Sequence, residues 1–452
     1  MNRIAFRAKA LFLIALLLIG GFSFFIAEYM TESENWVISS GSPHVYTGGN
    51  IGCGAIVDRD NTLLLDLRDG RVYSNLQALR QSTVHWVGDR YGSISAPALS
   101  YYAKELAGYD RINGVYSYGQ SGGVAELTLS AAMQTVALEA LGNNKGTVAV
   151  YNYKTGQLLC SVTTPTYDPD NLPQFTEGDP QYEGLYVNRF TQSAYTPGSI
   201  FKIVTLAAAL EENPEITESI FACTGVYRIG GQEITCEDTH GNQSLKDAFR
   251  NSCNCAFAQI ALDLGAEKLA YYVDKFGIVE SKSFDGIATV AGNFQVVGDE
   301  DANVAWASIG QYLDLVNPCA FMTFVGGIAN GGVAVDPYLV EKISVERSVT
   351  YRAEQKTGQI LLSKETAAVL QEYMKNNVTN KYGAEYFPGL IVGAKTGTGE
   401  VEGQKPNAML AGFVENSDMP LAFIVCVEDA GYGRAVCIPI ISKVLEAAKN
   451  LK

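Results

Sequence analysis

Three short motifs carry side chains that could perform acyl transfer. The first is Ser199 with Lys202 three positions later, the second is Ser252 with Asn254, and the third is Lys395-Thr396-Gly397. Residues three apart on a helix share one face, so Ser199 and Lys202 can form a nucleophile and its base. The set points to chemistry through a covalent serine ester, which uses neither histidine nor a metal.

Each motif alone is a weak signal, because roughly one or two Ser-x-x-Lys matches are expected by chance in a chain of 452 residues. Two of the motifs occur more than once in the chain, and the neighbouring residues show which copy can belong to a site. Lys-Thr-Gly also occurs at Lys154, in a hairpin turn between two apolar runs, and at Lys356, in a polar stretch. Lys395 instead follows the strand-like run 390–394, so its side chain can project into a cleft. A second Ser-x-Asn, at Ser33, falls in a linker just past the apolar N-terminal segment.

The nucleophile is expected in the first turn of a helix that runs to about Glu212. Unpaired N–H groups and the positive end of the helix dipole stabilise negative charge that develops on a carbonyl oxygen there. Lys202 can act as a base near neutral pH only if burial or neighbouring cations lower its pKa. Its neighbours along the chain are apolar, which favours burial: Ile200, Phe201, Ile203 and Val204.

The other two motifs are expected to face the same cleft. Ser252 would relay a proton to the leaving amine, and Asn254 would bind the substrate backbone. Lys395, Thr396 and Thr398 would bind a peptide carboxylate along a strand edge, which makes Thr396, Gly397 and Thr398 the substrate-binding residues. The N–H groups of Ser199 and Thr398 would form the oxyanion hole. Taken singly, these residues are equally typical of helix caps and edge strands.

Composition narrows the function. A net charge of −15 argues against a nucleic-acid partner, which needs a basic face. Nine cysteines cannot all pair internally. Cys223 and Cys236 flank an expected hairpin and could form a disulfide. Cys253 and Cys255 form a Cys-x-Cys with no other ligand cluster beside it in sequence, and the three histidines are widely separated, so the sequence argues against a zinc site.

An apolar, uncharged run extends from Ala10 to Ala27, near the lower length limit for a membrane-spanning helix. Basic residues precede it and acidic residues follow it, which predicts a cytoplasmic N-terminus and an extracytoplasmic remainder. A cleaved signal peptide is the alternative, but the run is long for one and no Ala-x-Ala site follows. We therefore expect a single-pass anchor in the cell membrane.

The pattern of apolar residues predicts an α+β fold. Helices are expected over 129–141, 199–212, 245–265, 303–330, 364–378 and 435–449, and the closing strands over 389–398, 408–415 and 420–428. A hairpin around Lys154 precedes most of the helices. Strands at both ends with helices between them predict one sheet shared by the terminal strands.

The chain resembles the class B penicillin-binding proteins, which are monofunctional peptidoglycan D,D-transpeptidases. The resemblance covers nearly everything outside the linker. Besides the three motifs it rests on 54–59, 127–129 with Gln134, 165–169, 188–189, 309–311, 329–332 and 393–398.

The resemblance implies a transpeptidase domain over 127–452, built from an antiparallel sheet flanked by helices and an all-helical lobe. A linker and a short N-terminal pedestal domain over 31–126 would precede it, after a cytoplasmic tip with a transmembrane anchor over 1–30, and no glycosyltransferase domain is expected. In this family Ser199 would attack the penultimate D-Ala of a stem peptide, and an amine of a neighbouring stem would resolve the acyl-enzyme. β-Lactams would acylate the same serine, and no cofactor is implied. From the lone anchor and the missing polymerase domain we further expect a partner, a membrane glycan polymerase of the shape, elongation, division and sporulation family.

Some positions depart from the family pattern. Ser130 and Asp170 replace the usual Asp and Asn, Tyr312 replaces a common glycine, and Met409-Leu410 replaces Trp-Phe. Three other functions fit parts of the pattern: a membrane-anchored serine β-lactamase, a β-lactam sensor and a non-catalytic cell-wall scaffold. A β-lactamase would need a base for deacylation, and none is identifiable in the sequence. A β-lactam sensor would need signalling segments, which this single-span pattern lacks. A non-catalytic scaffold would not need the complete set of catalytic side chains that the chain carries.

Overall fold

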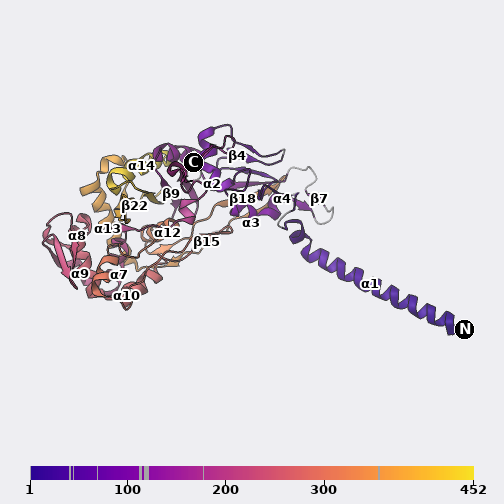
Figure 1. Ribbon diagram of the computed structural model, residues 1–452, viewed down its shortest axis with the longest axis horizontal. Helices are drawn as coiled ribbons and strands as arrows, with labels where there is room; N and C mark the ends of the chain where they lie inside the picture. The colour runs from indigo at the N-terminus through magenta and orange to yellow at the C-terminus, as the bar shows by residue number, and fades with distance from the viewer. Residues whose placement is uncertain are drawn as a thin grey trace.

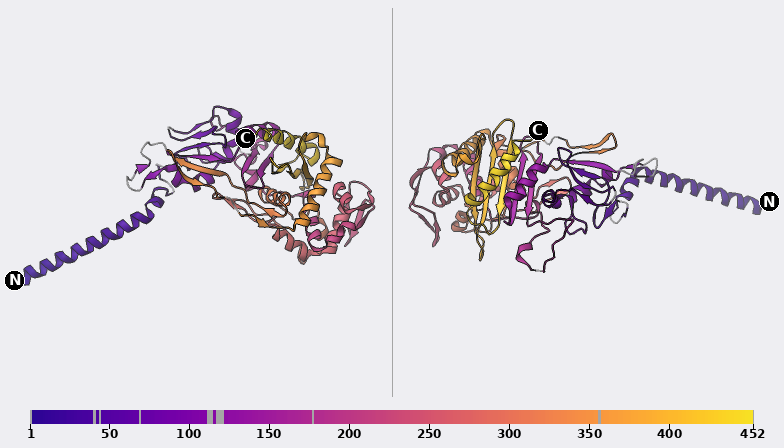
Figure 2. Two further views of the ribbon diagram at one scale, coloured as in Figure 1. Left: turned by 180° about the vertical axis from the view of Figure 1, so that it is seen from behind. Right: turned by 90° about the horizontal axis from the view of Figure 1, so that it is seen from above.

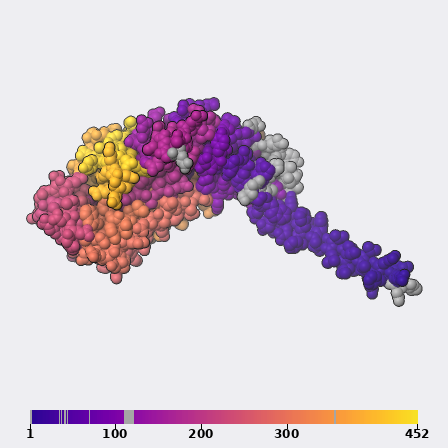
Figure 3. Space-filling view, in the orientation of Figure 1, coloured from indigo at the N-terminus to yellow at the C-terminus, as the bar shows by residue number. Residues whose placement is uncertain are grey.

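The computed structural model of the protein describes residues 2–39, 42–43, 45–68, 70–110, 115–116, 122–176, 178–354 and 357–451. Helix α1 (Asn2–Val37) stands clear of the rest of the molecule along most of its length (Figures 1 and 3). Its large apolar side chains are exposed, Leu18 by 69%. Within the described ranges it is the one helix long and apolar enough to cross a membrane. The predicted apolar segment therefore forms a helix that fits a membrane anchor.

The centre of the body is a five-stranded antiparallel sheet in the order β10-β9-β23-β22-β21. Its strands are β9 (Gly146–Asn152), β10 (Leu158–Thr164), β21 (Val392–Gly399), β22 (Asn407–Val414) and β23 (Leu421–Val427). Strand β9 pairs with β23 in the register Val150 opposite Phe423. The terminal strands thus share one sheet, as predicted, and the hairpin around Lys154 is confirmed.

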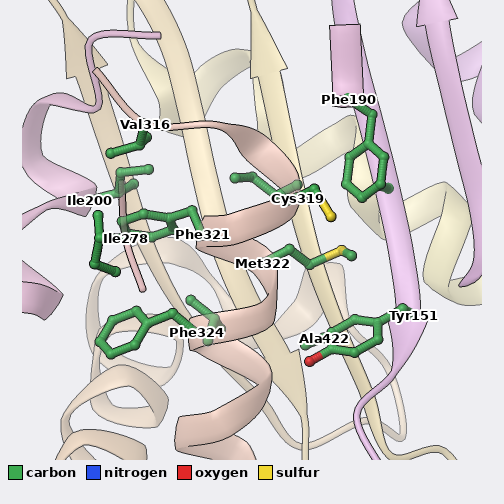
Figure 4. Close-up of a cluster of buried hydrophobic side chains, with 14 of the residues drawn as sticks. Tyr151, Phe190, Ile200, Ile278, Val316, Cys319, Phe321, Met322, Phe324 and Ala422 are labelled. Carbon is green, nitrogen blue, oxygen red and sulfur yellow. The ribbon is translucent and has the colours of Figure 1, made fainter. Parts of the chain in front are cut away.

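Helices cover both faces of this sheet (Figure 2). On one face, Val148 and Val150 pack with α5 (Ala131–Leu141) and α14 (Gly433–Ala448). On the other face, Ala149 and Tyr151 join the cluster of α12 (Pro318–Ala329). This alternation is what a strand buried on both sides requires. In Figure 4 the α12 side chains of Cys319 and Met322 point toward the strands that carry Tyr151 and Ala422.

A lobe at the end of the body opposite α1 contains a second group of helices (Figure 1). They are α7 (Lys202–Glu212), α8 (Leu245–Asn251), α9 (Asn254–Leu264), α10 (Ala266–Lys275) and α11 (Asp301–Ala307). The lobe also carries two small strand pairs, which the expectation of an all-helical lobe did not include. They are β11 (Ile220–Cys223) with β14 (Gly241–Ser244), and β12 (Val226–Ile229) with β13 (Gln232–Thr235).

The predicted helix over 245–265 is wrong, because the structure divides it at Ser252. This residue adopts a left-handed conformation with φ of 58° and ends α8. Cys253 then caps α9, its Sγ accepting a hydrogen bond from the N–H of Ala256 at 3.4 Å. The break places Ser252 and Asn254 at the junction of α8 and α9, where both line the cleft.

The predicted helix over 303–330 is also wrong. The structure has α11, a ten-residue loop over 308–317 and then α12. Gly310 in the loop has φ of +78°, which ends helical geometry, and Asn317 caps α12 just before Pro318. Tyr312 has φ of +70° in the same loop, a conformation that glycine adopts most easily.

A second, six-stranded sheet has the order β19-β18-β8-β3-β4-β5. Strands β3 (Ala55–Val57), β4 (Leu63–Asp66), β5 (Val72–Tyr73) and β8 (Gly123–Leu127) come from the N-terminal part, whereas β18 (Val340–Val345) and β19 (Ser348–Arg352) come from much later. Strand β8 pairs with β18, Gly123 lying opposite Val345. The division at 126/127 stays a prediction, and hydrogen bonds between strands cross it.

Two departures from the family pattern have structural roles here. The Ser130 side chain caps α5 by accepting a hydrogen bond from the N–H of Met133, and Asp170 pairs with Arg90 at 2.6 Å. The remaining helices are α2 (Gln77–Val87), α3 (Pro97–Tyr101), α4 (Ala103–Ala107), α6 (Arg189–Gln192) and α13 (Lys364–Asn377). The short strands β1, β2, β6, β7, β15, β16, β17 and β20 span 46–47, 50–51, 109–110, 115–116, 283–284, 287–288, 333–334 and 359–360.

Candidate active site

Ser199 lies in a tight turn (Gly198–Ile200) immediately before α7. Gly198 has φ of +53°, and its N–H donates to the carbonyl of Gly310 at 2.8 Å. A Cβ atom at position 198 would lie 2.1 Å from the carbonyl oxygen of Thr398 on β21. Only glycine fits this close approach, which presses the serine turn against the edge strand of the central sheet.

Lys202 begins α7 and is completely buried, with an exposed fraction of 0%. Its Nζ lies 2.8 Å from the Oγ of Ser199 and 2.6 Å from the Oδ1 of Asn254. The carbonyl oxygen of Ser252 is a third neighbour at 2.8 Å. Burial lowers the pKa of Lys202 to about 8, because removal from water penalises the ammonium form.

The Ser252 hydroxyl lies between two lysines. Its Oγ is 3.2 Å from Nζ of Lys202 and 3.0 Å from Nζ of Lys395. The Asn254 side chain donates to the carbonyl of Thr235 at 2.7 Å, which leaves its Oδ1 turned to Lys202. Ser199, Lys202, Ser252 and Lys395 thus form one chain of polar contacts along which a proton can move.

Lys395 on β21 is also completely buried. Its Nζ donates to the carbonyl of Thr396 at 2.9 Å. Burial, followed by repulsion from Lys202 and Lys381, holds the pKa of Lys395 well below its ordinary value. Both buried amines therefore favour the uncharged form more than an exposed lysine does.

The outer edge of β21 faces the serine turn. The N–H of Thr396 donates to the hydroxyl of Tyr382 at 3.2 Å, on the side away from β22. Residues two apart along an antiparallel strand turn their backbone groups to the same side, so the N–H of Thr398 also points away from β22. The carbonyl of Thr398 accepts from Nε2 of Gln311 at 3.1 Å. This geometry suits the predicted oxyanion hole, whose role stays a prediction.

These groups line a cleft of about 1080 Å³. It brings together every residue of the three motifs except the fully buried Lys202 and Lys395, whose Nζ atoms reach its polar side chains from behind. Other residues line it that the sequence did not single out as site residues, among them Glu237, Trp306, Lys381, Tyr382, Tyr432 and Arg434. Nothing in their spacing marks them, because they come from separate loops that only the fold brings together.

The competing copies of the motifs lie elsewhere. Nζ of Lys154 is 2.6 Å from Oδ1 of Asn330 on the surface. The expected linker position of Ser33 is wrong, because α1 continues through this residue to Val37. Lys356 lies outside the described residues. The choice of copies from context is therefore consistent with the fold.

The profile of the family described as "Penicillin binding protein transpeptidase domain" matches residues 146–446, which is well over half of the chain. The chain belongs to this family. The matched region contains the serine turn, the Ser252 loop and β21. The penicillin-binding transpeptidase fold thus supplies the sheet and the lobe whose meeting forms the cleft.

Named relatives agree with the family. Peptidoglycan D,D-transpeptidase PbpA of Mycobacterium tuberculosis is 29% identical over 364 residues, covering 72% of each chain. Stage V sporulation protein D of Bacillus subtilis is 28% identical, covering 71% of this chain and 52% of that one. Among solved structures, a ceftriaxone acyl-enzyme complex of penicillin-binding protein A from M. tuberculosis has a TM-score of 0.75 at 25% identity, covering 88% of this chain and 98% of that one. The D,D-transpeptidase domain of a peptidoglycan glycosyltransferase from Eggerthella lenta has a TM-score of 0.76 at 25% identity, with 88% and 97% coverage.

Proposed function

We propose that this protein is a peptidoglycan D,D-transpeptidase that cross-links stem peptides through an acyl-enzyme on Ser199 and is inhibited covalently by β-lactams. The observation that carries the proposal is the contact of 2.8 Å between a fully buried lysine amine and the Ser199 hydroxyl. Membership of the penicillin-binding transpeptidase family supports it. The relatives named D,D-transpeptidases and the β-lactam acyl-enzymes among the structural neighbours support the same reaction.

In the acylation step, Oγ of Ser199 forms a bond to the carbonyl carbon of the penultimate D-Ala while its proton passes to Nζ of Lys202. The N–H groups of Ser199 and Thr398 hold the oxyanion. The C–N bond then breaks, and the proton travels from Lys202 by way of the Ser252 hydroxyl to the departing amine of the terminal D-Ala. The contacts of Ser252 with both lysines support this relay.

In the second step, the amine of a neighbouring stem peptide attacks the ester carbonyl, loses a proton to Lys202 and forms the new amide. The ester C–O bond breaks and Ser199 recovers its proton. Protonated Lys395, with the hydroxyls of Thr396 and Thr398, binds the terminal carboxylate of the donor, and Asn254 binds the donor backbone. Thr396 and Thr398 on β21 line the cleft together with Asn254 on α9, and the buried Lys395 lies directly beside Thr396, which supports that assignment.

The test is covalent labelling with a fluorescent penicillin, comparing wild type with Ser199→Ala. We expect a stable adduct on wild type, with the label on the peptide containing Ser199, and none on a Ser199→Ala protein that melts at the wild-type temperature. Folded wild type without an adduct contradicts the proposal. An adduct that hydrolyses within seconds favours a β-lactamase instead.

Acylation should depend on pH through Lys202. Because its pKa is lowered to about 8, the amine gains its base form as the pH rises through that value, and the acylation rate constant should rise with it. The charged or titratable groups that act on this amine are Lys395, Lys381, Glu237, Cys236 and Cys253. Stopped-flow acylation between pH 6 and 10 gives the profile. A rate independent of pH across this window contradicts a titrating Lys202 base.

We also propose that α1 crosses the cell membrane with its N-terminus in the cytoplasm, so that the cleft faces the wall. The exposed apolar surface of α1 and the basic residues Arg3, Arg7 and Lys9 at its N-terminal end support this orientation. Protease added to intact spheroplasts should degrade the body of the protein. Protection of the body until the membrane is permeabilised would place it on the cytoplasmic side.

Cross-linking acts on glycan strands, and we propose that a membrane glycan polymerase of the shape, elongation, division and sporulation family supplies them. The uncovered apolar side chains of α1, such as Leu11 and Leu18, offer a surface for a partner's membrane helices. Detergent co-purification after in-cell cross-linking should recover such a polymerase. Its repeated absence, with α1 intact, counts against the partnership.

A further inference from the structure

Four side chains behind the Ser252 loop converge on one point. They are Cys223, Cys236, His240 and Cys253, and their sulfur and ring nitrogen atoms all lie within 4.8 Å of one another. They come from the end of β11, the segment after β13, the segment before β14 and the junction of α8 with α9. The sequence-based expectation that no ligand cluster accompanies the Cys-x-Cys is therefore wrong, because the β11–β14 lobe folds distant residues together.

The distances match those of a tetrahedral zinc site. Zinc bonds of about 2.3 Å to sulfur and 2.05 Å to nitrogen give tetrahedron edges of roughly 3.75 Å between sulfurs and roughly 3.5 Å between sulfur and nitrogen. The sulfurs of Cys236 and Cys253 are 3.7 Å apart. Nδ1 of His240 lies 3.5 Å from the sulfur of Cys223 and 3.6 Å from that of Cys236.

No two of the three cysteines in this cluster form a disulfide. Cys223, Cys236 and Cys253 are all free thiols, and 3.7 Å is far longer than the ~2.05 Å of an S–S bond. Three sulfurs and a histidine nitrogen around one centre form a soft donor set, which suits zinc and excludes magnesium and calcium as natural occupants.

Backbone N–H groups support the sulfurs in the way that an outer shell supports zinc thiolates. The N–H of Asn254 donates to the sulfur of Cys236 at 3.2 Å. The N–H of Ala256 donates to the sulfur of Cys253 at 3.4 Å. Both donors sit at the start of α9, so the positive end of this helix also faces the sulfurs.

We propose that this protein binds one Zn²⁺ through Cys223, Cys236, His240 and Cys253. Binding converts three thiols to thiolates and releases up to three protons. With four protein ligands the coordination shell is closed, so the ion is structural and takes no part in the acyl-transfer chemistry.

The position of the site gives the ion a function. Cys253 is the middle residue of the Ser252 motif, and Asn254 contacts a second ligand through its own N–H. Zinc therefore links the loop that carries Ser252 and Asn254, through Cys253, to the other three ligands, which lie beside the β11–β14 and β12–β13 strand pairs. Loss of the ion frees this loop and lengthens its contacts with Lys202, which slows acylation; this consequence rests on the proposed transpeptidase function.

The first experiment measures metal in the full-length protein, purified in detergent without chelators. Elemental mass spectrometry should find about one zinc per chain in wild type. The variants Cys236→Ser and His240→Ala should lose most of it, whereas Cys53→Ser, which changes a partly exposed thiol outside the cluster, should keep it. Wild-type protein without zinc, or equal zinc in His240→Ala, overturns the proposal, as does a Cys223–Cys236 disulfide in non-reduced peptide maps.

A second measurement avoids variants that fail to fold. Wild type stripped of metal under reducing conditions is titrated with Co²⁺, and tetrahedral thiolate coordination should produce sulfur-to-cobalt charge-transfer bands together with intense visible bands. Thermal melting should rise on addition of Zn²⁺ but not Mg²⁺. An octahedral cobalt spectrum contradicts the site. Neither readout involves acylation, so a zinc-bound protein that penicillin does not label would refute the transpeptidase function and leave the metal site standing.

Discussion

Replacing Lys202 with methionine is expected to slow acylation by fluorescent penicillin about 10²–10⁴-fold, which is the usual contribution of a positioned general base. Methionine is unbranched and of similar length, so it can occupy the buried space between Ser199 and Asn254. It removes the only amine within hydrogen-bond distance of Ser199 Oγ among the described residues. Stopped-flow labelling gives the ratio of rate constants.

Stability must be measured beside that rate. The substitution leaves Oδ1 of Asn254 without its partner, which costs about 1–3 kcal/mol, so the variant should melt lower but remain folded. Lys154→Met is the matched control, because it alters an exposed lysine in another Lys-Thr-Gly copy. A Lys202→Met protein that is acylated at the wild-type rate would show that another group accepts the proton.

Replacing Gly198 with alanine should affect both folding and acylation. A side chain at φ of +53° costs about 1–2 kcal/mol in backbone conformation. The new Cβ would also lie 2.1 Å from the carbonyl oxygen of Thr398, and relieving that overlap costs about 1–3 kcal/mol. The turn must move away from β21, which separates Ser199 from Thr398 and should slow acylation about 10²-fold.

Gly331→Ala separates the two effects. Gly331 has φ of +66°, but no heavy atom lies within 4 Å of the position its Cβ would take. In urea unfolding, this variant should therefore lose only the free energy that the backbone conformation costs. Its acylation rate should equal that of wild type. If Gly198→Ala behaves in the same way, the close approach of the serine turn to β21 does not matter for acylation.

Much of this arrangement could be predicted from local signals. Alternating apolar strands, Gly-containing turns and capping residues placed the Lys154 hairpin, α5 and the three closing strands. The apolar neighbours of Lys202 predicted its burial, and the strand before Lys395 distinguished it from the other copies. These features depend on residues close in sequence, where period and turn chemistry are informative.

What could not be predicted depends on tertiary contacts. The break at Ser252 occurs in a sequence with continuous helical periodicity, and its left-handed conformation is held by contacts with Lys202 and Lys395. Tyr382 contacts Thr396 from a segment without a motif. The three cysteines and His240 are up to 30 residues apart, between Cys223 and Cys253, and only the strand pairs of the lobe make them neighbours.

The pairing of β8 with β18 has a mechanical consequence. The N-terminal strands and the later strands belong to one hydrogen-bonded sheet, so the body cannot swing about a hinge at residue 127 without breaking that ladder. The lobe that lies opposite α1 (Figure 1) contributes Ser252, Asn254 and Trp306 to the lining of the cleft. The two sheets and the lobe then move as one rigid unit, and the distance from the N-terminal strands to the cleft stays constant while that unit moves.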